Sequence, residues 1–216
     1  MDDIIIQLQI EALDAQQDTG TLLRKAYLAA KKLHLTEFEK WVSKELNGYD
    51  SDDEIPTYRN IRGVIKFRNP YHGWLPVMIE DPELENLLSI RSLCEPVPKL
   101  IDLANTKERL HIPLPAQMSM MLSRMGDTPV NFEYAVFLDK SSIRNIVDIV
   151  KTKILEWSIL LEENGIHGAG MVFSSTEIES AQNPSIVNFT NNFYGSVNDT
   201  QLQQATRRSV QARSER

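Results

Sequence analysis

The chain has 216 residues, of which 42% are hydrophobic and 25% charged, proportions typical of a folded globular protein rather than a disordered one. Its net charge of −7 argues against a protein that coats DNA, because binding to phosphate requires a positive field. With a single cysteine, Cys94, the chain can form neither a disulfide framework nor a multi-cysteine zinc site.

The first residues do not resemble a secretory signal, because Asp2 and Asp3 stand where such a signal carries positive charge. No segment reaches the roughly 18 consecutive apolar residues that a membrane-spanning helix needs. We therefore expect a soluble, cytoplasmic protein with no membrane partner.

Residues 1–48 are predicted to form a bundle of three short helices. Apolar residues recur at helical spacing in two runs that Gly20 separates. A third helix is expected to begin at Thr36, which forms a capping-box pattern with Glu39, and to end at Gly48. The short connections favour antiparallel packing of the three helices.

An acidic loop follows the third helix. Closely spaced carboxylates can supply the hard oxygen ligands that Mg²⁺ and Ca²⁺ prefer. The pattern of a calcium-binding loop is absent, however, and no lysine follows an acid at the spacing used by one family of metal nucleases. A solvated loop is therefore the favoured interpretation and a metal site the alternative. The carboxylates concerned are Asp50, Asp52, Asp53 and Glu54.

From residue 57 the apolar pattern changes to short extended runs, which predict strands. Pro76 favours an edge position for the second run, and Asp81 with Pro82 predicts the start of a short helix. Basic residues alternate here with aromatic ones, which can bind single-stranded nucleic acid or a nucleotide, or can simply balance the acidic loop. They are Arg59, Arg62, Lys66 and Arg68, beside Tyr49, Tyr58 and Tyr71.

The clearest element is a long helix over residues 141–164. Its apolar residues recur at spacings of three and four and are Ile143, Val147, Val150, Ile154, Trp157 and Leu161. The run is too short to establish a coiled coil, so we favour an amphipathic core helix, with an oligomer interface as the alternative. The three tryptophans, Trp41, Trp74 and Trp157, all fall in apolar runs and are predicted core anchors.

The composition changes again after residue 183. Residues 184–204 are β-prone, rich in Asn and low in charge, and Asn ladders with stacked aromatics stabilise β assemblies. We expect a strand that pairs with another copy, or else an ordinary hairpin or edge strand. Residues 205–216 hold four Arg and one Glu. The residues predicted to self-associate are Phe189, Asn192, Phe193, Tyr194, Gly195 and Val197.

Catalytic motifs are absent from the sequence. No Gly-Lys pair occurs, which excludes a phosphate-binding P-loop. Cys94 and the four scattered histidines form no pattern that pairs a nucleophile with a base. No catalytic residue is predicted.

Several stretches of the sequence together resemble the AbiTii domain family of bacterial proteins, which is linked to abortive infection and phage defence. These stretches are residues 22–33, 41–49, 53–59, 154–166 and 171–174. The resemblance covers about residues 3–181. It implies a role in defence and supplies no catalytic residue.

We therefore expect an α+β fold in which residues 1–182 form one domain. Its helical part is 1–48, and its mixed part, 57–182, holds a small mixed β region and the long helix. A β-prone extension and basic tail, 183–216, follow. The favoured function is a sensor, adaptor or scaffold in phage defence, without a cofactor. It would form a homo-oligomer or bind a protein of the defence system or the phage.

The alternative function is a toxin that acts on nucleic acid or nucleotides. It would use a divalent metal bound to the acidic loop at 50–54, with the basic residues of the following strands binding phosphate. The net charge does not support a nucleic-acid partner.

Overall fold

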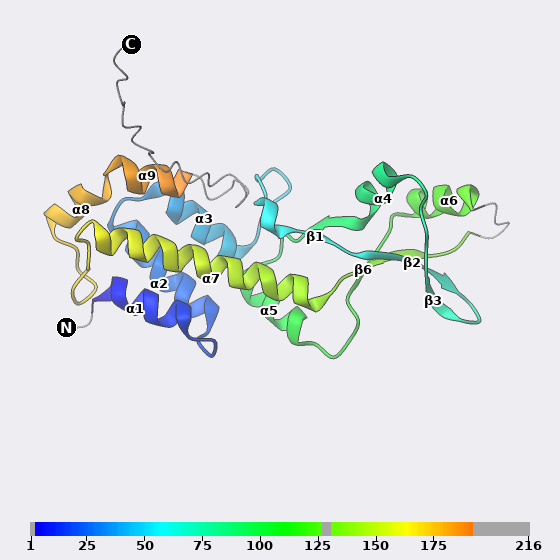
Figure 1. The fold of residues 1–216 in the computed structure, drawn as a ribbon, viewed down its shortest axis with the longest axis horizontal. Helices are drawn as coiled ribbons and strands as arrows, with labels where there is room; N and C mark the ends of the chain where they lie inside the picture. The colour runs from blue at the N-terminus through cyan, green and yellow to red at the C-terminus, as the bar shows by residue number, and fades with distance from the viewer. Residues whose placement is uncertain (1–2, 127–130, 192–216) are drawn as a thin grey trace, which may run out of the picture.

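The structure, a computed structural model, describes residues 3–126 and 131–191. Over these residues the molecule is elongated, with most of its helices at one end and a small β-sheet at the other (Figure 1). We call these two ends the helical lobe and the sheet lobe. The predicted α+β class is confirmed.

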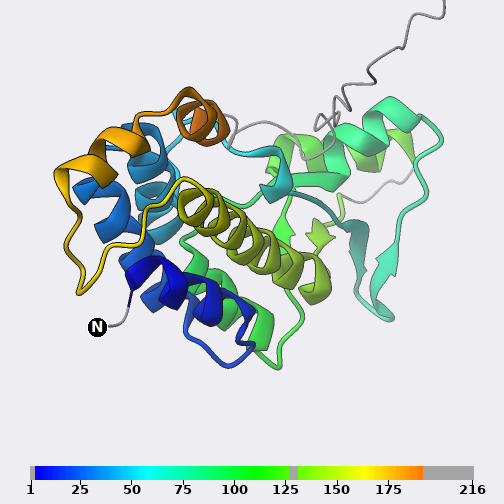
Figure 2. The ribbon, with the colours of Figure 1, turned by 60° about the vertical axis from the view of Figure 1, so that its left-hand side comes forward.

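The helical lobe is built around α7 (Lys140–Glu163), the predicted long helix. Helices α1 (Ile4–Leu13), α2 (Thr19–Lys32) and α5 (Val97–Asn105) pack against it (Figure 2). Helix α3 (Thr36–Asn47) packs on α2, and α8 (Ser175–Ala181) and α9 (Pro184–Asn191) follow α7 in the chain. The three helices predicted in the first 48 residues are therefore confirmed.

The six apolar residues that predicted α7 form its apolar seam, which packs against other parts of the same chain. All six of its predicted seam residues are buried, and Trp157 stacks on Phe38 of α3 with ring centroids 3.8 Å apart. Each such side chain contributes about 1.5–3 kcal/mol when it leaves water. The core-helix prediction is confirmed, and the alternative of an oligomer interface along this seam is wrong.

The sheet lobe holds four antiparallel strands in the order β3-β2-β6-β5. They are β2 (Val64–Asn69), β3 (Gly73–Pro76), β5 (His111–Pro113) and β6 (Tyr134–Phe137). Strand β3 lies at an edge, as Pro76 predicted.

Helices α4 (Pro82–Ser89) and α6 (Ala116–Met125) cover one face of this sheet (Figure 1). Asp81 caps α4 as predicted, accepting hydrogen bonds from the backbone N–H groups of Glu83 and Leu84. The core between helices and sheet contains Ile65, Leu88, Leu122, Tyr134 and Val136.

A thin connection joins the two lobes. The short helix η1 (Thr57–Arg59) leads into β1 (Asn60–Arg62), which pairs antiparallel with β4 (Ile90–Ser92). The first two turns of α7 pack against this connection, since Ile143 and Ile146 belong to the same core cluster as Ile61.

The capping box predicted at Thr36 is wrong. His34 adopts a left-handed backbone conformation, with φ at 57°, between the buried Leu33 and Leu35. This tight turn makes Leu35 the N-cap and places Thr36 inside the helix. Glu39 instead accepts hydrogen bonds from Tyr27 and Lys31 of α2.

The predicted β structure after residue 183 is wrong for residues 184–191, which form α9. Asn183 accepts a hydrogen bond from the backbone N–H of Ser185, and Pro184 suits the first position of a helix. Ile186 is fully buried and Phe189 packs against the main core, so Phe189 is not on an exposed pairing strand. Asn192, Phe193, Tyr194, Gly195 and Val197 lie outside the described residues.

Within the described ranges, no helix is both long enough and apolar enough to cross a lipid bilayer.

Candidate functional site

The acidic loop is folded around a lysine. Lys44 Nζ lies 2.6 Å from Asp53 Oδ2 and 3.2 Å from Asp50 Oδ2, so it occupies the position that a cation would have to take. The hydrogen bond from Lys44 lowers the pKa of the Asp53 carboxyl. Asp52 accepts a hydrogen bond from Ser51, and Glu54 is exposed.

Only two of the four carboxylates, those of Asp50 and Asp53, meet, and they meet at Lys44. Across residues 3–126 and 131–191, no three His, Cys, Asp or Glu side chains are grouped so that they could hold a metal ion. The metal site at the acidic loop therefore stays a prediction.

The four predicted basic residues do not form one surface either. Arg62 contacts Asn86 and Ser89 of α4, whereas Lys66 and Arg68 lie on β2. Arg59 is fully buried, which removes it from contact with any phosphate. The phosphate-binding prediction is wrong for Arg59, and it is unchanged for the other three.

Arg59 is the centre of a buried polar network beneath the connection of the lobes. Its Nη2 lies 2.5 Å from Glu45 Oε2, and both side chains are 0% exposed. Its Nη1 donates to the carbonyl oxygens of Leu93 and Glu95, at 2.7 and 2.8 Å. Burial disfavours the charged guanidinium, but the hydrogen bonds and charge of Glu45 raise the pKa of Arg59.

Two tyrosines complete the network. The hydroxyls of Tyr49 and Tyr58 donate to Glu45 Oε1 at 2.6 and 2.7 Å, and Trp41 Nε1 donates to the Tyr58 hydroxyl at 2.9 Å. Burial and the charge of Glu45 raise the pKa of both tyrosines, so both remain protonated donors. Since every polar group of this network has a hydrogen-bond partner, the network stabilises the connection between the two lobes. We call this network of Trp41, Glu45, Tyr49, Tyr58 and Arg59 the joint.

Glu45 was not singled out from the sequence, although a signal was present. It lies on the same face of α3 as Phe38, Trp41 and Val42, which are all buried. A carboxylate in line with an apolar stripe indicates a buried ion pair, because a lone buried charge is too costly.

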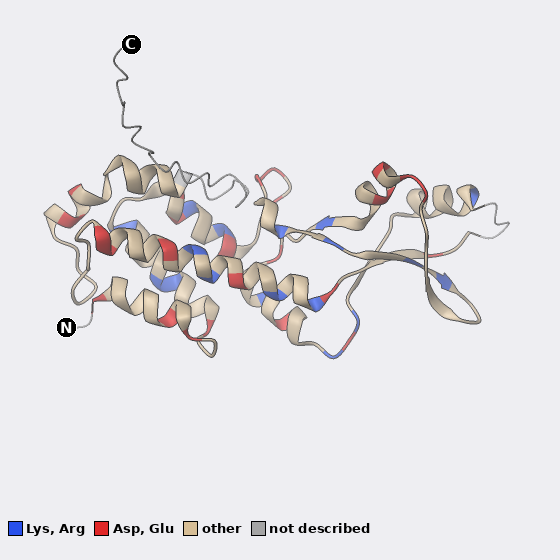
Figure 3. Cartoon of the chain, viewed as in Figure 1, with Lys and Arg blue, Asp and Glu red and all other residues tan. Residues whose placement is uncertain are grey.

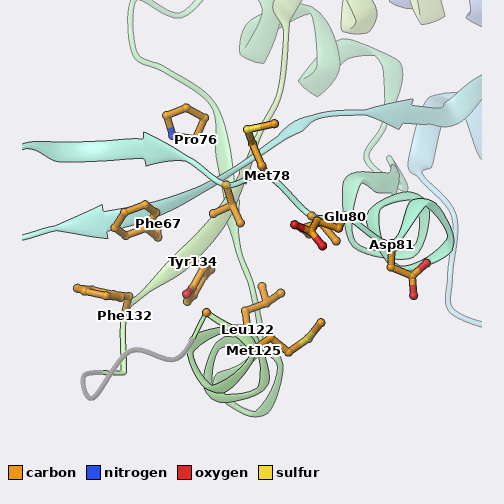
Figure 4. A pocket seen from close by; sticks show the side chains of 12 residues that line it. Phe67, Pro76, Met78, Glu80, Asp81, Leu122, Met125, Phe132 and Tyr134 are labelled. Atoms are coloured by element: carbon orange, nitrogen blue, oxygen red, sulfur yellow. The ribbon is translucent and has the colours of Figure 1, made fainter.

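The sheet lobe carries an open apolar groove of about 610 Å³ between the sheet and α6. Figure 4 shows Leu122 and Met125 of α6 across from Phe67 and Tyr134 of the sheet. The remaining lining residues are Pro76, Val77, Met78, Ile79, Glu80, Asp81, Gly126 and Phe132.

Large apolar side chains around this groove are left in contact with water. Met78 is 95% exposed and Met125 60% exposed. Methionine is flexible and polarizable, so surfaces rich in it adapt to varied apolar partners. Glu80 and Asp81 add negative charge at one end of the groove (Figure 4), and the segment that leads into α4 is coloured red in Figure 3.

The structure thus shows a two-lobed α+β protein with an open apolar groove in its sheet lobe. The model of the AbiTii family matches residues 3–186, and the chain belongs to this family. The family name points to abortive infection, a form of phage defence. No curated protein and no solved structure gives a match.

Proposed function

We propose that the chain is a non-enzymatic sensor or adaptor of an abortive-infection system and binds a protein partner in the groove of the sheet lobe. The observation that carries this proposal is the exposure of Met125 on a groove lined mostly by apolar side chains. Leaving such side chains in water gives up the free energy of their burial, which a bound partner would recover.

The partner fits this groove best as a segment with apolar anchors and positive charge beside them. The apolar anchors match the aromatic and methionine lining, and the positive charge matches Glu80 and Asp81. Residues 205–216 of a second copy carry four Arg and one Glu, which matches the positive charge of such a segment, so self-association is one possibility for the partner.

A charge placed in the groove tests the proposal. Met125→Glu puts a carboxylate on the lining, and Leu13→Glu is the matched control, because both residues are exposed and end a helix. We expect Met125→Glu to abolish protection in a phage plaque assay while its melting temperature stays near that of the unaltered protein. Equal protection by both variants would contradict the role of the groove.

Self-association is tested by light scattering on the full chain and on residues 1–191. A shorter truncation at 182 would remove the buried Ile186 and disturb the core. We expect only the full chain to form oligomers. Identical masses at every concentration would remove the second copy as the partner and leave a different protein in the groove.

A further inference from the structure

The sheet has a second face, opposite to α4 and α6. On β2, Ile65 and Phe67 pack toward these helices, so the alternating residues Val64, Lys66 and Arg68 point to the other side. Val64 is 55% exposed and the Arg68 side chain 64% exposed, which shows that this outer face is open.

Three rings from three strands meet on the outer face. Trp74 of β3 and Phe137 of β6 have ring centroids 5.1 Å apart, in an edge-to-face arrangement. His111 of β5 is the cross-strand neighbour of Phe137 and stacks on it at 5.1 Å with an interplanar angle of 17°. Trp74 and His111 are 5.6 Å apart.

The position of Trp74 corrects a sequence prediction. Trp41 and Trp157 are fully buried core anchors, as expected, but Trp74 is only half-buried and belongs to none of the core clusters found among the described residues. The same holds for Phe137. These rings therefore form a surface cluster and not part of the core.

Basic side chains lie beside the three rings. Lys66 Nζ lies 4.7 Å from the centroid of the Phe137 ring. Arg68 is the cross-strand neighbour of Trp74, and its Nη1 lies 3.3 Å from Glu133 Oε2, a pairing that offsets part of its charge. The aromatic rings and the basic side chains thus share one face across four adjacent strands.

We infer that the outer face of the sheet binds single-stranded nucleic acid. Unpaired bases stack on rings that solvent can reach, such as the half-buried Trp74 and the exposed His111, and Lys66 and Arg68 are placed to meet the phosphates between them. A duplex keeps its bases stacked inside, so it cannot use the rings. Lys66 and Arg68, which the sequence predicted to bind phosphate, thus lie on one surface, and this surface is separate from the groove.

The acidic charge of the whole chain sets the conditions for this binding. Few phosphates are contacted, so the affinity is modest and its salt dependence is shallow, because this dependence scales with the number of phosphates neutralised. The site does not depend on the proposed adaptor role, because α6 and the groove lie on the opposite side of the sheet.

The test is fluorescence anisotropy of the full chain with labelled oligouridine and oligothymidine of about 12 nucleotides, a length that spans one such platform. We expect binding at low salt and no comparable binding of a duplex of equal length. Trp74→Ala should weaken binding by about tenfold, and His111→Ala, on a different strand, should also weaken it. Lys66→Glu should weaken binding and reduce its salt dependence.

Matched variants separate this face from general electrostatics. Lys40→Glu reverses an exposed charge on α3, and Met125→Ala removes an exposed apolar side chain from the groove, and neither should change the affinity. Glu133→Gln should strengthen binding by releasing Arg68. Melting curves identify any unfolded variant. Absence of binding at low salt, equal affinity for the duplex, or unchanged affinity in folded Trp74→Ala would each overturn the inference.

Discussion

The two lobes differ in the unusual side chains that they hold: one region buries a charged pair, and the other exposes apolar side chains. The helical lobe and the joint bury a charged pair, Glu45 and Arg59, and give each of its atoms a partner. The sheet lobe leaves methionines and aromatic rings at the surface without such cover. We conclude that substitutions in the first region change mainly the free energy of unfolding, whereas those in the second change mainly binding.

The largest effect is expected from Glu45→Gln. This change leaves the buried Arg59 guanidinium without a compensating charge, which costs about 3–5 kcal/mol of the free energy of unfolding. Denaturant unfolding followed by circular dichroism measures it. The control Glu37→Gln breaks the exposed pair with Lys40 and should cost less than about 0.5 kcal/mol. Similar losses of unfolding free energy in Glu45→Gln and Glu37→Gln would contradict the stabilising role of the buried pair.

A second, smaller effect is expected from Gly168→Ala in the loop after α7. Gly168 has a φ of +65°, and an added Cβ would lie 2.5 Å from Phe173 and 2.6 Å from Ile4. Strain and overpacking together should cost about 2–3 kcal/mol. Gly165→Ala is the control, since its φ is +73° but no atom lies within 4 Å of the added Cβ, and it should cost about 1 kcal/mol. Equal costs would mean that backbone strain alone matters here.

The third effect depends on pH. Burial opposes ionisation of Glu177, but hydrogen bonds from the backbone of His167, Gly168 and Ser174 lower its pKa from 4.5 to about 2. Since the folded pKa is the lower one, the stabilisation is complete above pH 4.5 and is lost as the pH falls through about 2.

Glu177→Gln should therefore cost about 1–2 kcal/mol at neutral pH and almost nothing near pH 2. Unfolding curves of both proteins across this range measure the difference. If this loss of unfolding free energy does not vary with pH, it comes from the changed shape of the side chain and not from its lost charge. The groove variant Met125→Glu stands last in this order, because an exposed residue contributes little to stability.

Local signals in the sequence predicted much of the fold. The spacing of apolar residues identified α7, and Asp81 with Pro82 located the start of α4, since both signals act within a few residues. The same kind of signal failed at Thr36, where burial of Leu33 and Leu35 outweighed the capping pattern. At residues 184–191 a β-prone composition was outweighed by packing of Ile186 into the core.

The candidate sites could be predicted only in part. Lys66 and Arg68 were found because basic residues alternated with aromatic ones along the chain. The grouping of Trp74, His111 and Phe137 depends on the pairing of β3, β2, β6 and β5, which no local pattern reports. Arg59 looked like its neighbours in sequence, and only its partner Glu45, fourteen residues earlier, distinguishes it.

The position of α1 has a consequence for synthesis of the protein. The backbone N–H groups of Ile4 and Ile5 donate to Gly168 and His167, and α1 packs along α7. The four strands of the sheet lobe, by contrast, all lie between residues 64 and 137. A ribosome adds about 5–20 residues per second, so α7 is synthesised roughly 7–30 seconds after α1. During that interval its apolar face is available to chaperones, whereas the sheet lobe can already close.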